Sequence, residues 1–264
     1  MPRRSADVLP RTAHPSESMI EPSLSIVIPV YREIPRLAES IRQIAAFSKA
    51  RNGLATEVVF VDDGSPDNTA EVLAGFIREN GLVDAKILSY PVNRGKGYAV
   101  KRGVEAATGA YILMSDVDCS APLSEWTKLK TALDAGADFA CGSRTAPGAH
   151  IGVPPPLHRR ILSRLFHLLV YAAAGVRGIH DTQCGFKLFK AAPAKEVFNR
   201  LRIERFAFDV EMIAVARELG YTVVEIPVQW DYSGSSTVHV VSHGARMLWD
   251  LFRICLRRKT GKGR

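Results

Sequence analysis

Residues 24–30 read LSIVIPV, and five of these seven side chains are large and aliphatic. So short a continuous apolar run is typical of a strand that is buried on both faces of a parallel sheet. Residues 57–61, EVVFV, repeat the pattern, and a helical periodicity over 35–49 separates the two runs. Strands that alternate with helices at this spacing predict an α/β sheet.

The alternation continues along the rest of the chain. Further strands are expected at Lys86–Tyr90, Tyr111–Met114, Asp138–Cys141, Phe186–Phe189 and Thr222–Val228. Further helices are expected at 66–78, 97–107, 124–134, 157–174, 192–200, 208–219 and from His243 onward. Ser65 is expected to be the N-cap of the helix over 66–78, with Pro66 as its first residue. Ligands of such sheets lie beyond the carboxyl ends of the strands, so the acidic and glycine-rich turns found there form the expected site.

The net charge of +8 is unevenly distributed over the 264 residues. Residues 246–264 carry seven basic residues and one acid, and residues 146–180 carry four arginines and no acid. Removing these ten net positive charges leaves the rest of the chain at −2. The basic segments lack the aromatic stacking motifs of nucleic-acid-binding proteins, so no nucleic-acid partner is expected.

Cysteine spacing and hydropathy exclude other classes of protein. The four cysteines lie far apart without zinc-type spacing, which favours free thiols over disulfides or a zinc site. The longest nearly apolar stretch, Leu165–Val176, has 12 residues, whereas a membrane span needs about 20. Neither a transmembrane helix nor a signal peptide is expected.

Asp116 and Asp118 stand one residue apart, directly after a predicted strand. Carboxylates crowded at a strand end repel each other unless a cation lies between them, and hard oxygen ligands suit Mg²⁺ or Mn²⁺. A solvated acidic turn would have the same sequence pattern. The turns at 62–65 and 93–97 end other strands of the same sheet, and the second brings Lys96 as a phosphate contact. Their convergence with the aspartates favours a metal and phosphate site.

Four motifs in this order resemble those of the family 2 glycosyltransferases, which have the GT-A fold. They are IVIPVYRE (Ile26–Glu33), VDDGSPDNT (Val61–Thr69), NRGKGYAVKRG (Asn93–Gly103) and SDVD (Ser115–Asp118). Later segments are similar to the subgroup that contains dolichyl-phosphate glucosyltransferases and bacterial polyprenyl-phosphate enzymes. They are GSR (Gly142–Arg144), DTQCGFKLF (Asp181–Phe189), FAFDVEM (Phe206–Met212) and VVEIPVQW (Val223–Trp230). The resemblance covers residues 24–230 and implies a Rossmann-like mixed sheet flanked by helices.

The resemblance implies a site for a nucleotide-sugar donor. Its residues would be Pro29, Tyr31, Glu33, Asp62, Asp63, Lys96 and Asp116. The first three would line the base and ribose, Asp63 would accept a hydrogen bond from the base, and Asp62 would support that loop. Tyr31 could instead pack in the core. Asp116 and Asp118 would bind Mg²⁺ or Mn²⁺, whereas Ser120 stands where related mannosyl enzymes carry a glutamine ligand.

The resemblance also implies a lipid phosphate as the acceptor. Such a phosphate is already anionic near neutral pH, so it can attack the sugar without a base that removes a proton. Arg144 and Lys187 are expected to bind it. Asp209 and Glu211 are expected to fix the acceptor loop or the donor sugar, and Asp209 could instead act as a base. Arg144 could instead pair with Asp116 or Asp181, and Lys187 could be a solvated strand residue.

Four segments are therefore expected. Residues 1–22 form a disordered tail, 23–145 the nucleotide-sugar-binding half, 146–232 the acceptor-binding half, and 233–264 a basic amphipathic tail at the membrane interface. The tail and the helix at 157–174 would hold the enzyme peripherally on the cytoplasmic face of an anionic membrane; alternatively, they pack in the core or against a partner.

The expected reaction is metal-dependent, inverting transfer of a hexose, glucose from UDP-glucose, to polyprenyl or dolichyl phosphate. Transfer of mannose or an acetamidosugar to the same acceptor, or transfer to a saccharide hydroxyl, are the alternatives.

Overall fold

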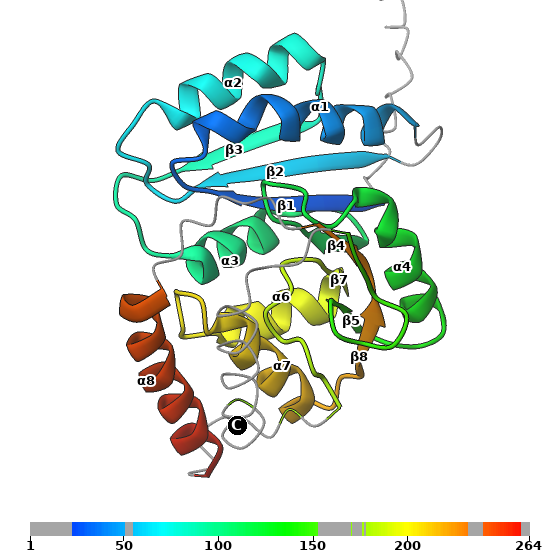
Figure 1. Cartoon of the computed structure of the whole chain (residues 1–264), viewed down its shortest axis with the longest axis vertical. Helices are drawn as coiled ribbons and strands as arrows, with labels where there is room; N and C mark the ends of the chain where they lie inside the picture. The colour runs from blue at the N-terminus through cyan, green and yellow to red at the C-terminus, as the bar shows by residue number, and fades with distance from the viewer. Residues whose placement is uncertain are drawn as a thin grey trace, which may run out of the picture.

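A seven-stranded mixed sheet forms the centre of the computed structural model, in the order β3-β2-β1-β4-β7-β5-β8 (Figure 1). The structure describes residues 23–50, 55–152, 170, 176, 178–231 and 240–259. The strands of this sheet are β1 Leu24–Val30, β2 Thr56–Asp62, β3 Ala85–Ser89, β4 Tyr111–Met114, β5 Phe139–Ser143, β7 Lys187–Lys190 and β8 Val223–Pro227. Strand β7 is antiparallel to both of its neighbours, β4 and β5, and the other pairs are parallel. The predicted mixed α/β sheet is confirmed.

The central strand β1 is buried on both faces. Ile26, Val27 and Ile28 have no exposed surface. Because alternate side chains of a strand point to opposite faces, Ile26 and Ile28 enter one hydrophobic cluster and Val27 enters the other. A strand that contributes to two cores needs apolar residues on both faces, which explains the continuous run LSIVIPV.

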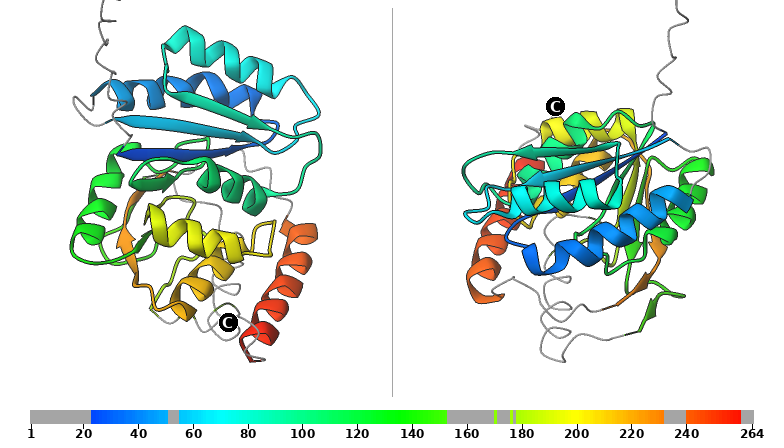
Figure 2. Two further views of the ribbon diagram at one scale, coloured as in Figure 1. Left: turned by 180° about the vertical axis from the view of Figure 1, so that it is seen from behind. Right: turned by 90° about the horizontal axis from the view of Figure 1, so that it is seen from above.

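Helices cover both faces of the sheet (Figure 2). The cluster on one face contains residues of α1 Ile34–Ala50, α2 Thr69–Asn80 and α4 Trp126–Asp134, which follows the 3-10 turn Leu123–Glu125. The cluster on the other face contains residues of α3 Lys96–Ala106, α6 Ala191–Arg200, α7 Phe208–Glu218 and α8 Val240–Lys259. A short parallel pair, β6 His150–Ile151 and β9 Gln229–Trp230, lies outside the main sheet. Within the described ranges, no helix combines the length and apolar character that a bilayer span needs.

The predicted start of α2 is wrong. The helix begins at Thr69, with Asn68 at its N-cap position. Ser65 instead belongs to the turn after β2: its N–H donates to Asp62 Oδ1 (3.2 Å), and its hydroxyl accepts from the N–H of Arg32 (3.0 Å). The helix starts late because Ser65 joins the ends of β1 and β2.

The two predicted halves share one sheet. Strand β7, from the segment assigned to the acceptor, is inserted between β4 and β5 of the segment assigned to the donor. This insertion brings residues that follow position 180 next to the end of β4. The predicted tail at 1–22 lies outside the described residues, as does most of the helix predicted at 157–174.

Candidate active site

The candidate site lies at the carboxyl edge of the sheet, where β1, β2 and β4 run parallel to one another. In the register of the sheet, Val30 is opposite Asp62, and Asp62 is opposite Ser89. The ends of β1, β2 and β3 are therefore level in the sheet, and the turns that follow these strands meet. The predicted convergence of the acidic and glycine-rich turns is confirmed.

Asp63 ties the turn after β2 to the segment after β3. Its carboxylate accepts four hydrogen bonds, from Tyr90 OH (2.7 Å), Asn93 Nδ2 (2.7 Å), Arg94 N (3.0 Å) and Gly95 N (2.8 Å). These donors fill the roughly four acceptor positions of a carboxylate. In this structure Asp63 therefore holds the loop that carries Lys96, and its contact with the base stays a prediction.

Asp62 is the last residue of β2, and its role at a donor site stays a prediction. Its carboxylate accepts hydrogen bonds from Ser65 N (3.2 Å) and Ser89 Oγ (3.1 Å). Gly64 adopts a φ of +64°, and a Cβ there would lie 2.5 Å from the carbonyl carbon of Val92. Only glycine permits this close approach of the two loops.

The loop after β1 brings Tyr31 and Glu33 to the same edge. Tyr31 is 37% exposed, so the alternative that it packs in the core is wrong. Glu33 forms an ion pair with Arg36 (2.9 Å). Burial raises the pKa of Glu33 despite Arg36, and the nearby carboxylates of Asp118 and Asp116 raise it further. Glu33 therefore feels the negative charge of both aspartates. Pro29, in β1, is half-buried.

Three cations act on the charge of Asp116. Lys96 Nζ is 2.5 Å from Asp116 Oδ1. Burial alone would raise the pKa of Asp116, but Lys96, then Lys187 and Arg144, hold it below its ordinary value. On the other side, a Cβ at Gly185 would lie 1.9 Å from Asp116 Oδ2. The segment before β7 therefore packs directly against a charged carboxylate.

Asp116 and Asp118 have the chemistry of a site for a hard divalent cation, because both offer carboxylate oxygens. One oxygen of Asp118 accepts a hydrogen bond from Ser120 N (3.0 Å). Within the described part of the chain, no three His, Cys, Asp or Glu side chains form a group that could hold a metal ion. Mg²⁺ takes one or two carboxylates in many sites and completes its coordination with substrate phosphate and water, and metal binding by this pair stays a prediction.

Arg144 is held in a fork by Asp181. Its Nε and Nη2 donate to the two carboxylate oxygens at 2.7 and 2.8 Å, and its backbone N–H donates at 2.9 Å. Glu225 in turn accepts from the backbone N–H groups of His180 (3.0 Å) and Asp181 (2.7 Å), and it lies 2.9 Å from the ring Nδ1 of His180. The Arg144 side chain is nevertheless 26% exposed. Of the two predicted alternatives for Arg144, pairing with Asp181 is the one found.

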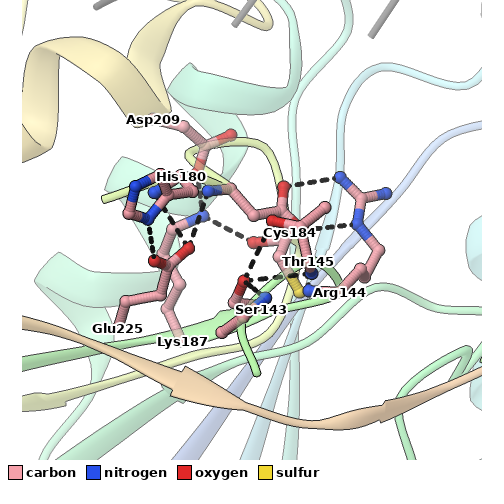
Figure 3. Close-up of polar contacts among 10 residues, drawn as sticks. Ser143, Arg144, Thr145, His180, Cys184, Lys187, Asp209 and Glu225 are labelled. Carbon is pink, nitrogen blue, oxygen red and sulfur yellow. Dashed lines mark hydrogen bonds and ion pairs between the residues drawn. The ribbon is translucent and has the colours of Figure 1, made fainter. Parts of the chain in front are cut away.

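Lys187 is fully buried, so the alternative of a solvated strand residue is wrong. Its ammonium donates to Asp209 Oδ1 (2.6 Å) and to the carbonyl of Cys184 (2.5 Å) (Figure 3). Burial alone would lower the pKa of Lys187, but the Asp209 carboxylate outweighs it and raises the pKa. Lys187 and Asp209 therefore form a charged pair inside the protein.

Two supporting residues, Gly185 and Glu225, were not singled out in the sequence. Both lie inside segments that carry the family resemblance, DTQCGFKLF and VVEIPVQW. A glycine between a polar turn and an apolar strand signals a close approach, and a glutamate inside a mostly apolar strand signals a buried partner. The partner itself could not be read from either signal.

Comparisons with known proteins agree with this geometry. The family model described as "Glycosyl transferase family 2" matches residues 25–198. The chain is 34% identical over 249 residues to the dolichyl-phosphate beta-glucosyltransferase of Dictyostelium discoideum, covering 90% of this chain and 75% of that protein. It is 34% identical over 252 residues to the protein of that name from Homo sapiens, covering 91% and 77%.

Among solved structures, the fold is similar to glucosyl-3-phosphoglycerate synthase from Mycobacterium tuberculosis in complex with Mg²⁺ and UDP. The TM-score is 0.65 at 19% identity, covering 90% of this chain and 79% of that one. Mannosyl-3-phosphoglycerate synthase from Rubrobacter xylanophilus is similar at a TM-score of 0.60 and 19% identity, covering 92% and 75%. At this identity the likeness concerns the fold, which is GT-A. The chain belongs to glycosyl transferase family 2, and it is a glycosyltransferase of the GT-A fold.

Proposed function

We propose that the protein transfers glucose from UDP-glucose to dolichyl phosphate or another polyprenyl phosphate, with inversion at the anomeric carbon. The observation that carries this proposal is a pair of positioned cations, Lys96 at 2.5 Å from Asp116 on the donor side and the partly exposed Arg144 held by Asp181 on the acceptor side. Such a centre can hold a phosphate on each side of the sugar. The names of the relatives from Dictyostelium and human support the sugar and the acceptor.

The donor diphosphate would bind beside Lys96 and the paired aspartates. Asp116 and Asp118 would hold Mg²⁺ or Mn²⁺, and the similar synthase structures include complexes of UDP with each of these ions. When bound, the ion supplies a positive charge that stabilises the departing UDP. Lys96, already directed at Asp116, would share that task.

The acceptor phosphate would bind to Arg144. Its side chain is partly exposed, and two hydrogen bonds to Asp181 orient its guanidinium, so little conformational freedom is lost when a phosphate binds. Because the lipid phosphate is already anionic, its oxygen can attack the sugar without a general base. Lys187 is too buried to touch a ligand in this conformation, and we assign to it the positioning of Asp209.

Helix α8 would provide the membrane contact. Leu251 and Ile254 are buried, but four apolar side chains of the same helix are exposed, namely Leu248, Trp249, Phe252 and Leu256. One face of α8 therefore packs in the core, and another presents apolar surface. Arg253 is also exposed beside this surface and suits an anionic lipid. Attachment to the cytoplasmic face stays a prediction.

The proposal can be tested with the purified chain, radiolabelled UDP-glucose, Mg²⁺ or Mn²⁺, and a polyprenyl phosphate in detergent. We expect metal-dependent transfer of label to the lipid and a β-linked product by NMR. Matched reactions with GDP-mannose, with UDP-N-acetylglucosamine and with the polyprenol that lacks the phosphate should give little product. Equal transfer to the polyprenol, or no transfer from UDP-glucose to the phosphate, would contradict the proposal.

A further inference from the structure

The first turn of α7 carries two buried carboxylates, Asp209 and Glu211. Each residue turns the helix by about 100°, so side chains two residues apart are rotated by about 200° about the axis and point to nearly opposite sides. Asp209 accordingly faces Lys187 in the candidate site, whereas Glu211 faces α8. The function described above does not use Glu211.

Glu211 joins two segments that are remote in the sequence. Its Oε2 accepts hydrogen bonds from the backbone N–H groups of Arg202 (3.0 Å) and Ile203 (2.8 Å), and its Oε1 accepts from Arg257 Nη1 of α8 (2.8 Å). The second nitrogen of that guanidinium, Nη2, donates to the carbonyl of Arg200 (3.4 Å). Burial raises the pKa of Glu211 despite these donors. One side chain thus fixes the connection between α6 and α7 against α8.

That connection, residues 201–205, in turn covers the loop that carries Lys96. The N–H of Tyr98 donates to the carbonyl of Glu204 (2.9 Å), and the Glu204 carboxylate pairs with Arg94. Both contacts reach the loop on either side of Lys96. The connection therefore determines where the start of α3 lies.

The contact between these segments leaves no free space. A Cβ at Gly95 would lie 2.7 Å from the carbonyl oxygen of Glu204, and a Cβ at Gly97 would lie 2.8 Å from that of Ile203. Backbone packed this closely transmits a displacement instead of absorbing it. A shift of the connection would therefore move Lys96, which stands between the two glycines.

We propose that Glu211 is a positioning residue for the donor: it holds residues 202–205 against the loop at 93–98 and thereby fixes Lys96 where the donor diphosphate binds. Arg257 provides the second anchor and makes α8 part of this support. The binding of the donor diphosphate by Lys96 rests on the proposed function, whereas the support of the loop by Glu211 is independent of any ligand.

Amide hydrogen exchange of the ligand-free protein tests the support of the loop. In Glu211→Gln, exchange of peptides covering residues 93–100 should become about tenfold faster, as expected when a charge-assisted hydrogen bond holding the neighbouring segment is weakened. Peptides from β1 and β2 should keep their wild-type rates. The matched control is Glu196→Gln, which removes a carboxylate paired at the surface with Arg200 and Tyr221; it should leave the loop unchanged.

Titration with UDP and Mg²⁺ tests the consequence for the donor. We expect the Kd of Glu211→Gln to rise about tenfold, the KM for UDP-glucose to rise with it and kcat to change less. Arg257→Gln should cause a smaller change in the same direction, because Glu211 keeps its bonds to Arg202 and Ile203. It also serves as the test variant if Glu211→Gln does not fold.

If exchange at 93–100 were unchanged in a folded variant, Glu211 would not support the loop, and the proposal would be overturned. If exchange in β1 and β2 became faster to the same extent, Glu211 would only stabilise the protein as a whole, and the proposal would also be overturned. Faster exchange with an unchanged Kd for UDP would also overturn it, because Lys96 would not depend on the loop. If the wild-type protein bound no UDP at all, the proposed donor would be wrong, and the exchange experiment would still decide whether Glu211 supports the loop.

Discussion

The donor and acceptor sides of the site hold their charged groups in different ways. On the donor side, one carboxylate, Asp63, collects four donors that are all from a single neighbouring loop. On the acceptor side, each cation has its own carboxylate, Arg144 with Asp181 and Lys187 with Asp209. The donor side thus combines a carboxylate that shapes a loop with the single pair of Lys96 and Asp116, whereas on the acceptor side both cations are held in pairs of their own.

This difference has a physical reason. In the proposed function the donor side holds a divalent cation, which the carboxylates of Asp116 and Asp118 would attract. The acceptor side would present Arg144 to a phosphate, and burying an unpaired lysine beside it costs several kcal/mol. Pairing Lys187 with Asp209 removes most of that cost. Substitutions on the donor side should therefore affect activity, and those on the acceptor side should affect stability as well.

The largest effect should come from Asp118→Asn on the donor side. The asparagine oxygen can still accept from Ser120 N, so we expect the free energy of unfolding to stay within about 0.5 kcal/mol of wild type. Turnover should fall about a thousandfold, because the metal loses a charged ligand. Steady-state kinetics over a range of Mn²⁺ concentrations measure this loss, with Asp134→Asn on the surface as the control. Retained activity would remove Asp118 from the metal site.

Lys187→Met is the corresponding change on the acceptor side. It leaves Asp209 buried beside an apolar side chain, and we expect the free energy of unfolding in urea to fall by about 3 kcal/mol. The double variant Lys187→Met/Asp209→Leu should recover most of this loss, because neither charge remains. If Lys187→Met were as stable as the wild type, Asp209 would not depend on this pair, and the proposed contrast between the two sides would fail.

The pH dependence of stability measures how much a buried carboxylate that accepts several hydrogen bonds contributes to the free energy of unfolding. Glu57 has this role at the start of β2: burial would raise its pKa, but hydrogen bonds from Lys86, Ser25 and Thr108 lower it from 4.5 to about 2. A lowered pKa stabilises the folded protein above pH 4.5, and this contribution is lost as the pH falls through about 2. Urea unfolding should show a loss of about 2 kcal/mol over this interval.

Glu57→Gln is the control for this measurement. The variant should be less stable than the wild type at pH 7, and the difference between the two should shrink as the pH falls towards 2. A difference that stayed constant between pH 7 and 2 would mean that the charge of Glu57 contributes nothing.

The smallest effect on the chemistry should come from Trp249→Ala/Phe252→Ala on the exposed face of α8. Binding to vesicles of anionic phospholipid, measured by sedimentation, should weaken about tenfold, with the turnover of a short-chain, water-soluble acceptor unchanged. Val83→Ala, which shortens an apolar side chain that is 89% exposed elsewhere, is the matched control. Unaltered vesicle binding would assign this face of α8 to another partner.

Much of the fold was accessible from the sequence because its signals are local. The bounds of β1 and β4 agree with the prediction, since a continuous apolar run marks a strand buried on both faces. The donor motifs were accessible for the same reason, because each follows its strand directly. The start of α2 was missed because Ser65 contacts Asp62 and Arg32, and the contact with Arg32 crosses to another strand.

The sequence by itself determined the alternation of strands and helices, the family and the residues that carry charge at the strand ends. Only the tertiary structure decided which charges pair: Arg144 with Asp181, 37 residues away, Lys187 with Asp209, 22 residues away, and Glu211 with Arg257, 46 residues away. It also divided the apolar residues of α8 between a buried and an exposed face. The pairs of Arg144 and Lys187 depend on β7 entering the sheet between β4 and β5, because Asp181 precedes β7 and Lys187 begins it. Hydrophobic periodicity shows which side chains along a helix or strand must be buried, but it does not show which remote segment covers them.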